Sequence, residues 1–302
     1  MNGMRSLLLG LMFAALAVIG FASTFILGSA LTKTCGVSPI VLTFLRFAIS
    51  AAVLFPVLLG TQRGRRALAS PRRKDWVRMA WVGPVGTMLM AWLLFSGCAR
   101  VSAANSSMAD ALSPLMVFSV MAVRSRQIRW YEVFGVLSGF FGAVLVIQVV
   151  TKSGVTLESY SVGDVYILLS ACAWGIYTVF GRDVVGRIGS SAFSAWTMLL
   201  GVVTAGLPLL FCSCLWPKDV MAWLLIAGQG LFATLMPFWA WNAAQRYLPV
   251  SLLGMSAYFI PVLVVALGIL FLGEGATPLQ WIGTVFIVMS AVVEIRGSKS
   301  VV

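Results

Sequence analysis

The stretch that decides the fold runs from Ser102 to Met121 and reads SAANSSMADALSPLMVFSVM. It is long and apolar enough to cross a bilayer, since a spanning helix needs about 20 mostly apolar residues. A carboxylate, Asp110, and a proline, Pro114, nevertheless lie near its centre. Ser106, Asp110 and Ser113 fall on one face of a helix, and that face cannot point toward lipid. The sequence therefore predicts a face turned toward protein or an aqueous cavity.

The rest of the chain has the same apolar character. Of its 302 residues, 60% are hydrophobic and 10% are charged, whereas about a quarter are charged in a typical soluble protein. Apolar segments of spanning length recur along the chain and are separated by short polar breaks. We therefore predict an all-α polytopic membrane protein whose ten transmembrane helices are Leu7–Leu27, Val37–Leu59, Trp76–Ser96, Ser102–Met121, Trp130–Val150, Val162–Gly181, Ser190–Cys212, Val220–Trp241, Val250–Leu272 and Leu279–Ile295.

The net charge of +12 is distributed as a topology signal rather than as a nucleic-acid patch. If ten helices cross the membrane, sixteen Lys and Arg residues fall on one side and four on the other. The stretch RRALASPRRK at 65–74 supplies five of the sixteen. Because basic loops stay inside, both termini are predicted to be cytoplasmic, and the chain is predicted to lie in the cytoplasmic membrane.

The two halves of the sequence resemble each other. Ser38–Pro56 and Ser190–Pro208 have the same length and both end in proline, and Pro114 matches Pro261. We therefore predict two five-helix repeats, 1–150 and 160–302. Since each repeat has an odd number of spans, the second enters from the opposite side, as in many secondary transporters. Ala257 then stands in the second repeat where Asp110 stands in the first.

Several of these segments also resemble one known family. GCARVSAANSSMADALSPLMV at 97–117, AAQRYLPVSLLGMSAYFIPV at 243–262, the pair Gly273-Glu274, GDVYILLSACAWGIYTVFGR at 163–182 and Arg46 within FLRF are similar to the EamA-type members of the drug/metabolite transporter superfamily. The resemblance covers almost the whole chain. It implies ten helices around a central cavity and efflux of amino acids or other small metabolites.

Two charges are predicted near the middle of the membrane. Asp110 lies eight residues into its helix and Arg46 nine residues into the second helix, which enters from the same side. Both should therefore lie about 12 Å deep. An unpaired charge there costs at least about 2.5–3.5 kcal/mol. One interpretation is a structural ion pair between them. A second is that Asp110 binds a substrate ammonium group or carries a coupling proton, and a third is that it is a cavity-facing charge with only a hydration role.

Further candidates for substrate binding are polar or aromatic residues at central depths. Pro114 and Pro261 each interrupt a span, as positions near transporter binding sites often do, although a packing kink is the alternative. Tryptophans near predicted span ends, namely Trp76, Trp130, Trp216, Trp241 and Trp281, are interpreted as interfacial anchors. The binding candidates, for which helix packing is the alternative role, are Ser23, Thr24, Asn105, Ser106, Asp110, Trp174, Tyr177, Thr178 and Tyr258.

These features predict a secondary transporter that works by alternating access around a central cavity. The sequence has no GxxxxGK[ST] motif, so gradients rather than ATP should drive transport, and a proton would have to use a carboxylate because histidine is absent. We expect a small-molecule substrate, the lipid bilayer as surroundings, and no cofactor, metal or nucleic acid. The alternatives are a receptor or scaffold without transport, or an intramembrane lipid-modifying enzyme, for which we find no catalytic cluster.

Overall fold

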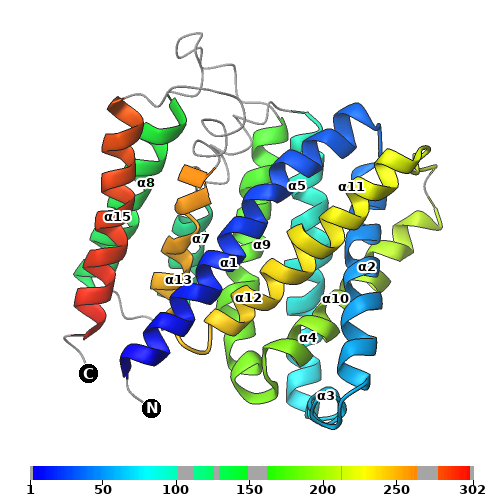
Figure 1. Ribbon diagram of the computed structural model, residues 1–302, viewed down its shortest axis with the longest axis horizontal. Coiled ribbons are helices and arrows are strands. Elements are labelled where there is room, and N and C mark those ends of the chain that lie inside the picture. The colour runs from blue at the N-terminus through cyan, green and yellow to red at the C-terminus, as the bar shows by residue number, and fades with distance from the viewer. Residues whose placement is uncertain are drawn as a thin grey trace.

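The computed structural model describes residues 3–100, 112–125, 129–148, 162–211, 213–260, 262–263 and 278–299. Every regular element in these ranges is a helix, which agrees with the predicted all-α class (Figure 1). Short π-helical segments, labelled η, follow or interrupt some of the α-helices. The elements are α1 (Gly3–Ser29), η1 (Ala30–Thr34), α2 (Pro39–Leu59), α3 (Gln62–Leu68), α4 (Arg73–Pro84), η2 (Val85–Leu89), α5 (Met90–Cys98), α7 (Ser113–Ser125), α8 (Trp130–Gln148), α9 (Val162–Ile188), α10 (Ser190–Leu209), α11 (Val220–Gly230), η3 (Leu231–Leu235), α12 (Met236–Ala244), α13 (Val250–Ser256) and α15 (Pro278–Lys299).

Within the described ranges, six continuous helical stretches are long and apolar enough to cross a membrane. They overlap the predicted first, second, third, sixth, seventh and eighth spans. The tenth predicted span lies within α15, and the fourth, fifth and ninth are described in part, as α7, α8 and α13. Large apolar side chains also cover the outside of the bundle, and on α1 the exposed ones follow helical spacing along one face. This lipid-facing row consists of Leu8, Met12, Ile19 and Ile26.

The helices pack in the pattern that two related repeats predict. The second span, α2, packs against its counterpart α10, and in the same way α7 packs against α13 and α8 against α15. Figure 1 shows α8 and α15 side by side at one edge of the bundle. Two further contacts correspond to each other in the two halves. The first span packs on the eighth through α1 and α12, and the sixth span packs on the third through α9 and α5.

The glycine-rich face of α8 packs against other helices of the same chain. A Cβ at Gly142 would lie 2.6 Å from the carbonyl oxygen of Gly283 on α15, so only glycine permits this close approach. A Cβ at Gly139 would lie 2.5 Å from the ring of Tyr258. The face that small residues open for helix packing therefore contacts α13, α15 and the adjoining turn.

Two of the π-helical segments occupy matching places. η2 interrupts the third span after the 12-residue α4, and η3 interrupts the eighth span after the 11-residue α11. A π-turn widens the helix and disturbs its regular hydrogen bonds, which is why such turns are frequent at functional sites. Neither segment is predicted by the apolar patterns of the sequence.

One end of the bundle carries most of the described basic residues. Here α1 begins, α15 ends and α3, with the sequence QRGRRAL, connects α2 to α4 (Figure 1). We call it the basic end. Helix α9 runs from the opposite end to the basic end, so its residues give the depth of each feature of the site described next.

Candidate functional site

A buried guanidinium, that of Arg46 on α2, forms the centre of the candidate site. The residue is 1% exposed. Its Nε donates a hydrogen bond of 2.7 Å to Thr234 Oγ1, and its Nη2 donates one of 3.2 Å to the Ala233 carbonyl. Its Cζ lies 5.1 Å from the ring centroids of Phe47 and Phe95, within the range of cation–π attraction. Among the described residues no carboxylate forms an ion pair with this charge.

The acceptors for Arg46 come from the π-turn η3. The Thr234 hydroxyl donates its proton to the Gln229 carbonyl at 2.7 Å, which leaves its oxygen free to accept from Arg46. The Ala233 carbonyl also accepts a 3.0 Å hydrogen bond from Thr24 Oγ1 on α1. Through these hydrogen bonds, η3 of the second predicted repeat contacts both α1 and α2 of the first.

A small central cavity lies beside Arg46. Its volume is about 60 Å³, enough for a few water molecules but below the 300–1,000 Å³ of typical ligand pockets. The wall is mainly apolar and aromatic, with four polar side chains among the described residues. The aromatic lining residues are Phe21, Phe25, Trp174, Phe238 and Trp241, and the polar ones are Thr24, Arg46, Ser113 and Ser170.

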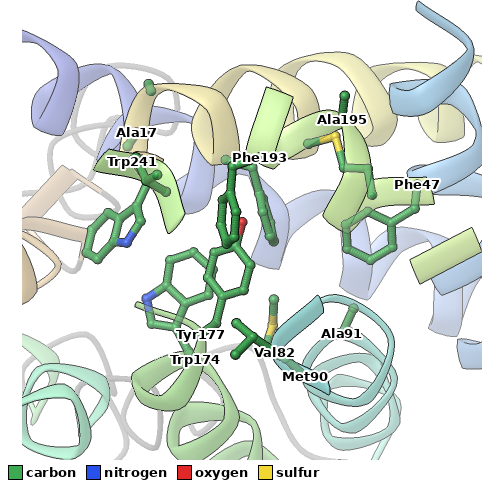
Figure 2. Packing of buried hydrophobic residues seen from close by; sticks show 14 of the residues in the cluster. Ala17, Phe47, Val82, Met90, Ala91, Trp174, Tyr177, Phe193, Ala195 and Trp241 are labelled. Atoms are coloured by element: carbon green, nitrogen blue, oxygen red, sulfur yellow. The ribbon is translucent and has the colours of Figure 1, made fainter. Parts of the chain in front are cut away.

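A packed layer closes this cavity toward the basic end. The Trp174 ring, which faces the cavity, stacks on Tyr177 at a centroid distance of 5.4 Å (Figure 2). The Tyr177 hydroxyl accepts a 2.9 Å hydrogen bond from the amide nitrogen of Asn242, which also donates to Ser194 Oγ. Gln245 in turn donates to the Asn242 amide oxygen at 3.1 Å. This fully buried layer joins α9, α10 and α12.

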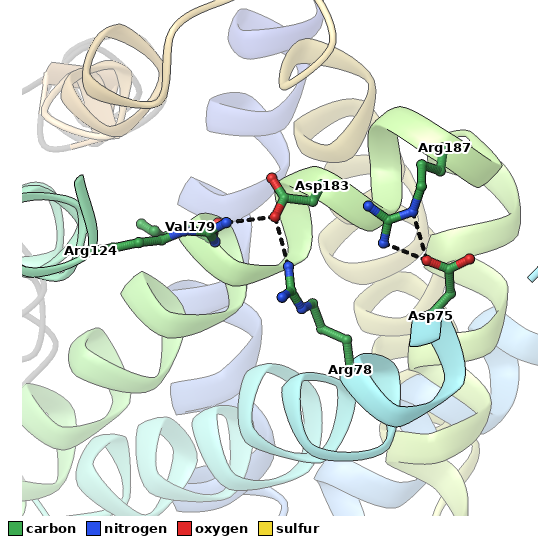
Figure 3. A network of polar contacts seen from close by, with 6 residues as sticks. All are labelled: Asp75, Arg78, Arg124, Val179, Asp183 and Arg187. Carbon is green, nitrogen blue, oxygen red and sulfur yellow. Dashed lines mark hydrogen bonds and ion pairs between the residues drawn. The ribbon is translucent and has the colours of Figure 1, made fainter. Parts of the chain in front are cut away.

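Ion pairs form a second layer at the basic end (Figure 3). Asp183 on α9 accepts from Arg78 of α4 at 2.7 Å and from Arg124 of α7 at 2.5 Å. One turn further along α9, Arg187 pairs with Asp75 of α4. All three ion pairs join a helix of the first predicted repeat to α9 of the second. Trp174 and Asp183 are nine residues apart on α9, which corresponds to about 13 Å along the helix. The two layers therefore close about this thickness of protein between the cavity and the basic end.

The predicted site residues are distributed over several places. Thr24, Arg46 and Trp174 line the central cavity. Tyr177 and Thr178 lie behind it in the packed layer, where Thr178 Oγ1 accepts a 3.1 Å hydrogen bond from Trp241. The structure therefore brings five of the candidates into one region, although they come from three helices far apart in sequence.

Other candidates lie elsewhere. Ser23 donates to the Gly20 carbonyl of its own helix at 2.7 Å, and the Tyr258 hydroxyl donates to the Val136 carbonyl of α8 at 3.0 Å. Pro114 occupies the first turn of the described part of α7, where a missing N–H breaks no helical hydrogen bond. The candidates outside the described residues are Asn105, Ser106, Asp110 and Pro261.

The prediction that Trp241 is an interfacial anchor is wrong. Its side chain is 0% exposed, lines the cavity and donates to Thr178. The spacing in PFWAW at 237–241 carried the missing signal, because Phe238 and Trp241 are three residues apart and share one helix face. The other four tryptophans of that set are partly exposed, namely Trp76, Trp130, Trp216 and Trp281.

The described residues offer no group of three or more His, Cys, Asp or Glu side chains that could hold a metal ion. The lining of the cavity offers a guanidinium that can bind a carboxylate and aromatic faces that can contact an apolar group.

Comparisons with known proteins point in one direction. A sequence model of the EamA-like transporter family matches residues 8–148 and again residues 161–295. The aromatic amino acid exporter YddG of Ancylobacter novellus is 26% identical over 253 residues, which are 82% of this chain and 85% of that protein. The "probable terminal-alkyne amino-acid exporter" of Streptantibioticus cattleyicolor is 25% identical and covers 78% of both chains.

Two further matches extend the comparison. The uncharacterized transporter YyaM of Bacillus subtilis is 25% identical over 81% of this chain and 80% of its own length. A solved crystal structure, 25% identical in sequence, superposes with a TM-score of 0.70 and covers 92% of this chain and 95% of that chain. These relatives are named as transporters or exporters, not enzymes, in agreement with the prediction that this chain is not an enzyme.

Proposed function

The chain belongs to the EamA-like transporter family, and on this premise we propose that it exports amino acids with apolar or aromatic side chains. It is a multi-pass membrane transporter with a small-molecule substrate. Two of its relatives are named as amino-acid exporters, one for aromatic and one for terminal-alkyne amino acids. Both substrate classes combine a carboxylate with an apolar side chain.

The single observation that carries this proposal is the pairing of Arg46 with an aromatic wall. A guanidinium is the side chain best suited to hold a carboxylate, because its planar fork offers parallel N–H donors. Arg46 lines the cavity, and the aromatic rings of Trp174, Phe238 and Trp241 lie around the same space. In the proposed complex, Arg46 binds the substrate carboxylate and these rings contact its side chain.

Alternating access between two five-helix repeats is the proposed mechanism. The cavity of about 60 Å³ is too small for an amino acid, so loading requires the repeats to separate. The ion pairs of Asp183 and Asp75 join the repeats at the basic end and would have to break when that end opens. In the proposed arrangement, ten spans cross the inner membrane and the basic end faces the cytoplasm. Breaking the ion pairs would then admit solute from the cytoplasm.

Asp110 is the proposed partner for the substrate ammonium group or a coupling proton. It lies outside the described residues, and its sequence position and the symmetry of the two halves support this assignment. Ala257 occupies the matching position of the second repeat and lines the central cavity. Ser113, three residues after Asp110 in the sequence, lines it too. If Asp110 instead pairs with Arg46, the substrate carboxylate would compete for the same guanidinium.

Counterflow into liposomes tests the proposed transport. Purified full-length protein is reconstituted, the vesicles are loaded with unlabelled amino acids one at a time, and entry of labelled phenylalanine or leucine is measured. We expect transient accumulation with apolar and aromatic amino acids and none with their decarboxylated amines. A receptor or scaffold would give no accumulation with any of them, and equal accumulation with the amines would contradict the proposed role of the carboxylate.

Asp110→Asn separates a coupling role from a structural one. We expect a folded protein whose net uphill transport in a pH gradient is lost, because an amide, unlike a carboxyl group, does not take up and release a proton in this pH range, while exchange of substrate without net flux persists. Both rates are measured between about pH 6 and pH 8 on protein checked by size-exclusion chromatography. A variant with normal uphill transport and the normal pH profile would show that Asp110 is not the coupling group.

A further inference from the structure

A second cavity lies at the basic end, away from the site described above. Its volume is about 390 Å³, and we call it the arginine cavity because three arginines line it: Arg63, Arg187 and Arg246. Arg63 belongs to α3, Arg187 to the last turn of α9, and Arg246 follows α12. The first repeat thus contributes one guanidinium and the second contributes two.

The charges of the arginine cavity are not balanced by the described residues. Arg187 pairs with Asp75 through Nε and Nη2, but no described carboxylate forms an ion pair with Arg63 or Arg246. Bringing like charges together in a partly enclosed space raises the free energy of the folded state. An anion that entered the cavity would remove this cost.

Backbone groups add hydrogen-bond donors to the same space. Gly189 adopts φ = +88°, a conformation that favours glycine, and this turn lets α10 begin at the wall of the cavity. No described side chain caps α10, and Ser190, Ser191 and Ala192 at its start all line the cavity. The first N–H groups of a helix have no acceptor within the helix.

From the three guanidiniums, the partly enclosed volume of about 390 Å³ and these donors together, we propose that the arginine cavity binds a phosphate group. Arginine holds phosphate through parallel, charge-assisted hydrogen bonds. Two sources offer this chemistry, an anionic phospholipid headgroup and free phosphate, and the experiment below distinguishes them. A group bound here contacts α3, α9, α10 and the residue after α12, so it joins the two repeats at the basic end. This proposal does not depend on which solute the central cavity transports.

Thermal unfolding with two ligand arms tests the site. The first arm titrates inorganic phosphate against purified protein in detergent, with chloride at matched ionic strength as the reference. The second compares nanodiscs that contain phosphatidylglycerol with nanodiscs of phosphatidylcholine alone. We expect at least one arm to raise the unfolding midpoint of the natural protein. A response to phosphatidylglycerol but not to free phosphate assigns the site to lipid, and the reverse assigns it to a soluble phosphate.

Two double variants with the same loss of charge make the test specific. Arg63→Gln with Arg246→Gln removes two guanidiniums from the cavity, and we expect the apparent affinity to fall about tenfold or more. Arg66→Gln with Arg73→Gln removes two exposed charges that do not line it, and should keep the full response. Arg246→Gln alone serves if the first double variant folds poorly. Equal responses of the two double variants, or no response of the natural protein in either arm, would overturn the proposal.

Discussion

Arg46→Gln should lower the export of an apolar amino acid by about 10- to 100-fold, because it removes charge-assisted hydrogen bonds worth about 1.5–3 kcal/mol each. The glutamine can still donate to Thr234 or to the Ala233 carbonyl, so the helix contacts around η3 are partly kept. The measurement is counterflow of labelled phenylalanine in liposomes that contain equal amounts of natural and variant protein.

Competition with a decarboxylated analogue distinguishes recognition from damage to the fold. In the natural protein, phenylalanine should compete far better than 2-phenylethylamine, since only the amino acid offers a carboxylate to Arg46. In Arg46→Gln this preference should shrink. Thr234→Val is the matched control: it removes one contact of Arg46 but keeps the charge, so the preference should survive. A folded Arg46→Gln protein with an unchanged preference would refute the assignment of Arg46 as the carboxylate site.

Arg187→Gln should destabilise the structure closed at the basic end more than Asp75→Asn does. The Asp75 side chain is 1% exposed, so losing Arg187 leaves a buried carboxylate without its ion-pair partner. The Arg187 side chain is 36% exposed, so after Asp75→Asn it can turn to solvent. We expect a cost of about 2–3 kcal/mol for Arg187→Gln, below the about 3–5 kcal/mol of a fully buried pair.

The double variant and a thiol probe test this expectation. In the Asp75→Asn background, Arg187→Gln should add little further loss in the unfolding midpoint, because the carboxylate that it would strand is gone. Ser194→Cys, placed in the packed layer of a background without native cysteines, should react faster with a membrane-impermeant maleimide from the basic end when Arg187→Gln is added. Additive losses in stability, or an unchanged labelling rate, would show that this ion pair does not hold the end closed.

The membrane class and most span boundaries could be predicted from the sequence, because long apolar runs leave few alternatives. The second, third, seventh and eighth spans lie within three residues of the predicted ends, whereas the first and sixth helices continue seven residues beyond theirs. Arg46 was also a sound candidate from sequence, since a charge in the middle of such a run needs a buried partner. Its described partners were not predictable, because the π-turn that supplies Thr234 and the Ala233 carbonyl is a local departure from regular helix geometry with no clear sequence signal.

The sequence by itself determined that this protein is a helical membrane protein with polar groups at the level of the membrane core, because apolar runs of about 20 residues satisfy their backbone groups in hydrocarbon as helices and unpaired charge is costly there. Only the tertiary structure decided which faces meet. It buried Trp241 against Thr178 instead of leaving it at an interface, joined Asp183 to two helices of the other repeat, and gathered Arg63, Arg187 and Arg246 around one cavity. The physical reason is that the rotation and tilt of each helix are set by contacts between side chains distant in sequence, which no single segment contains.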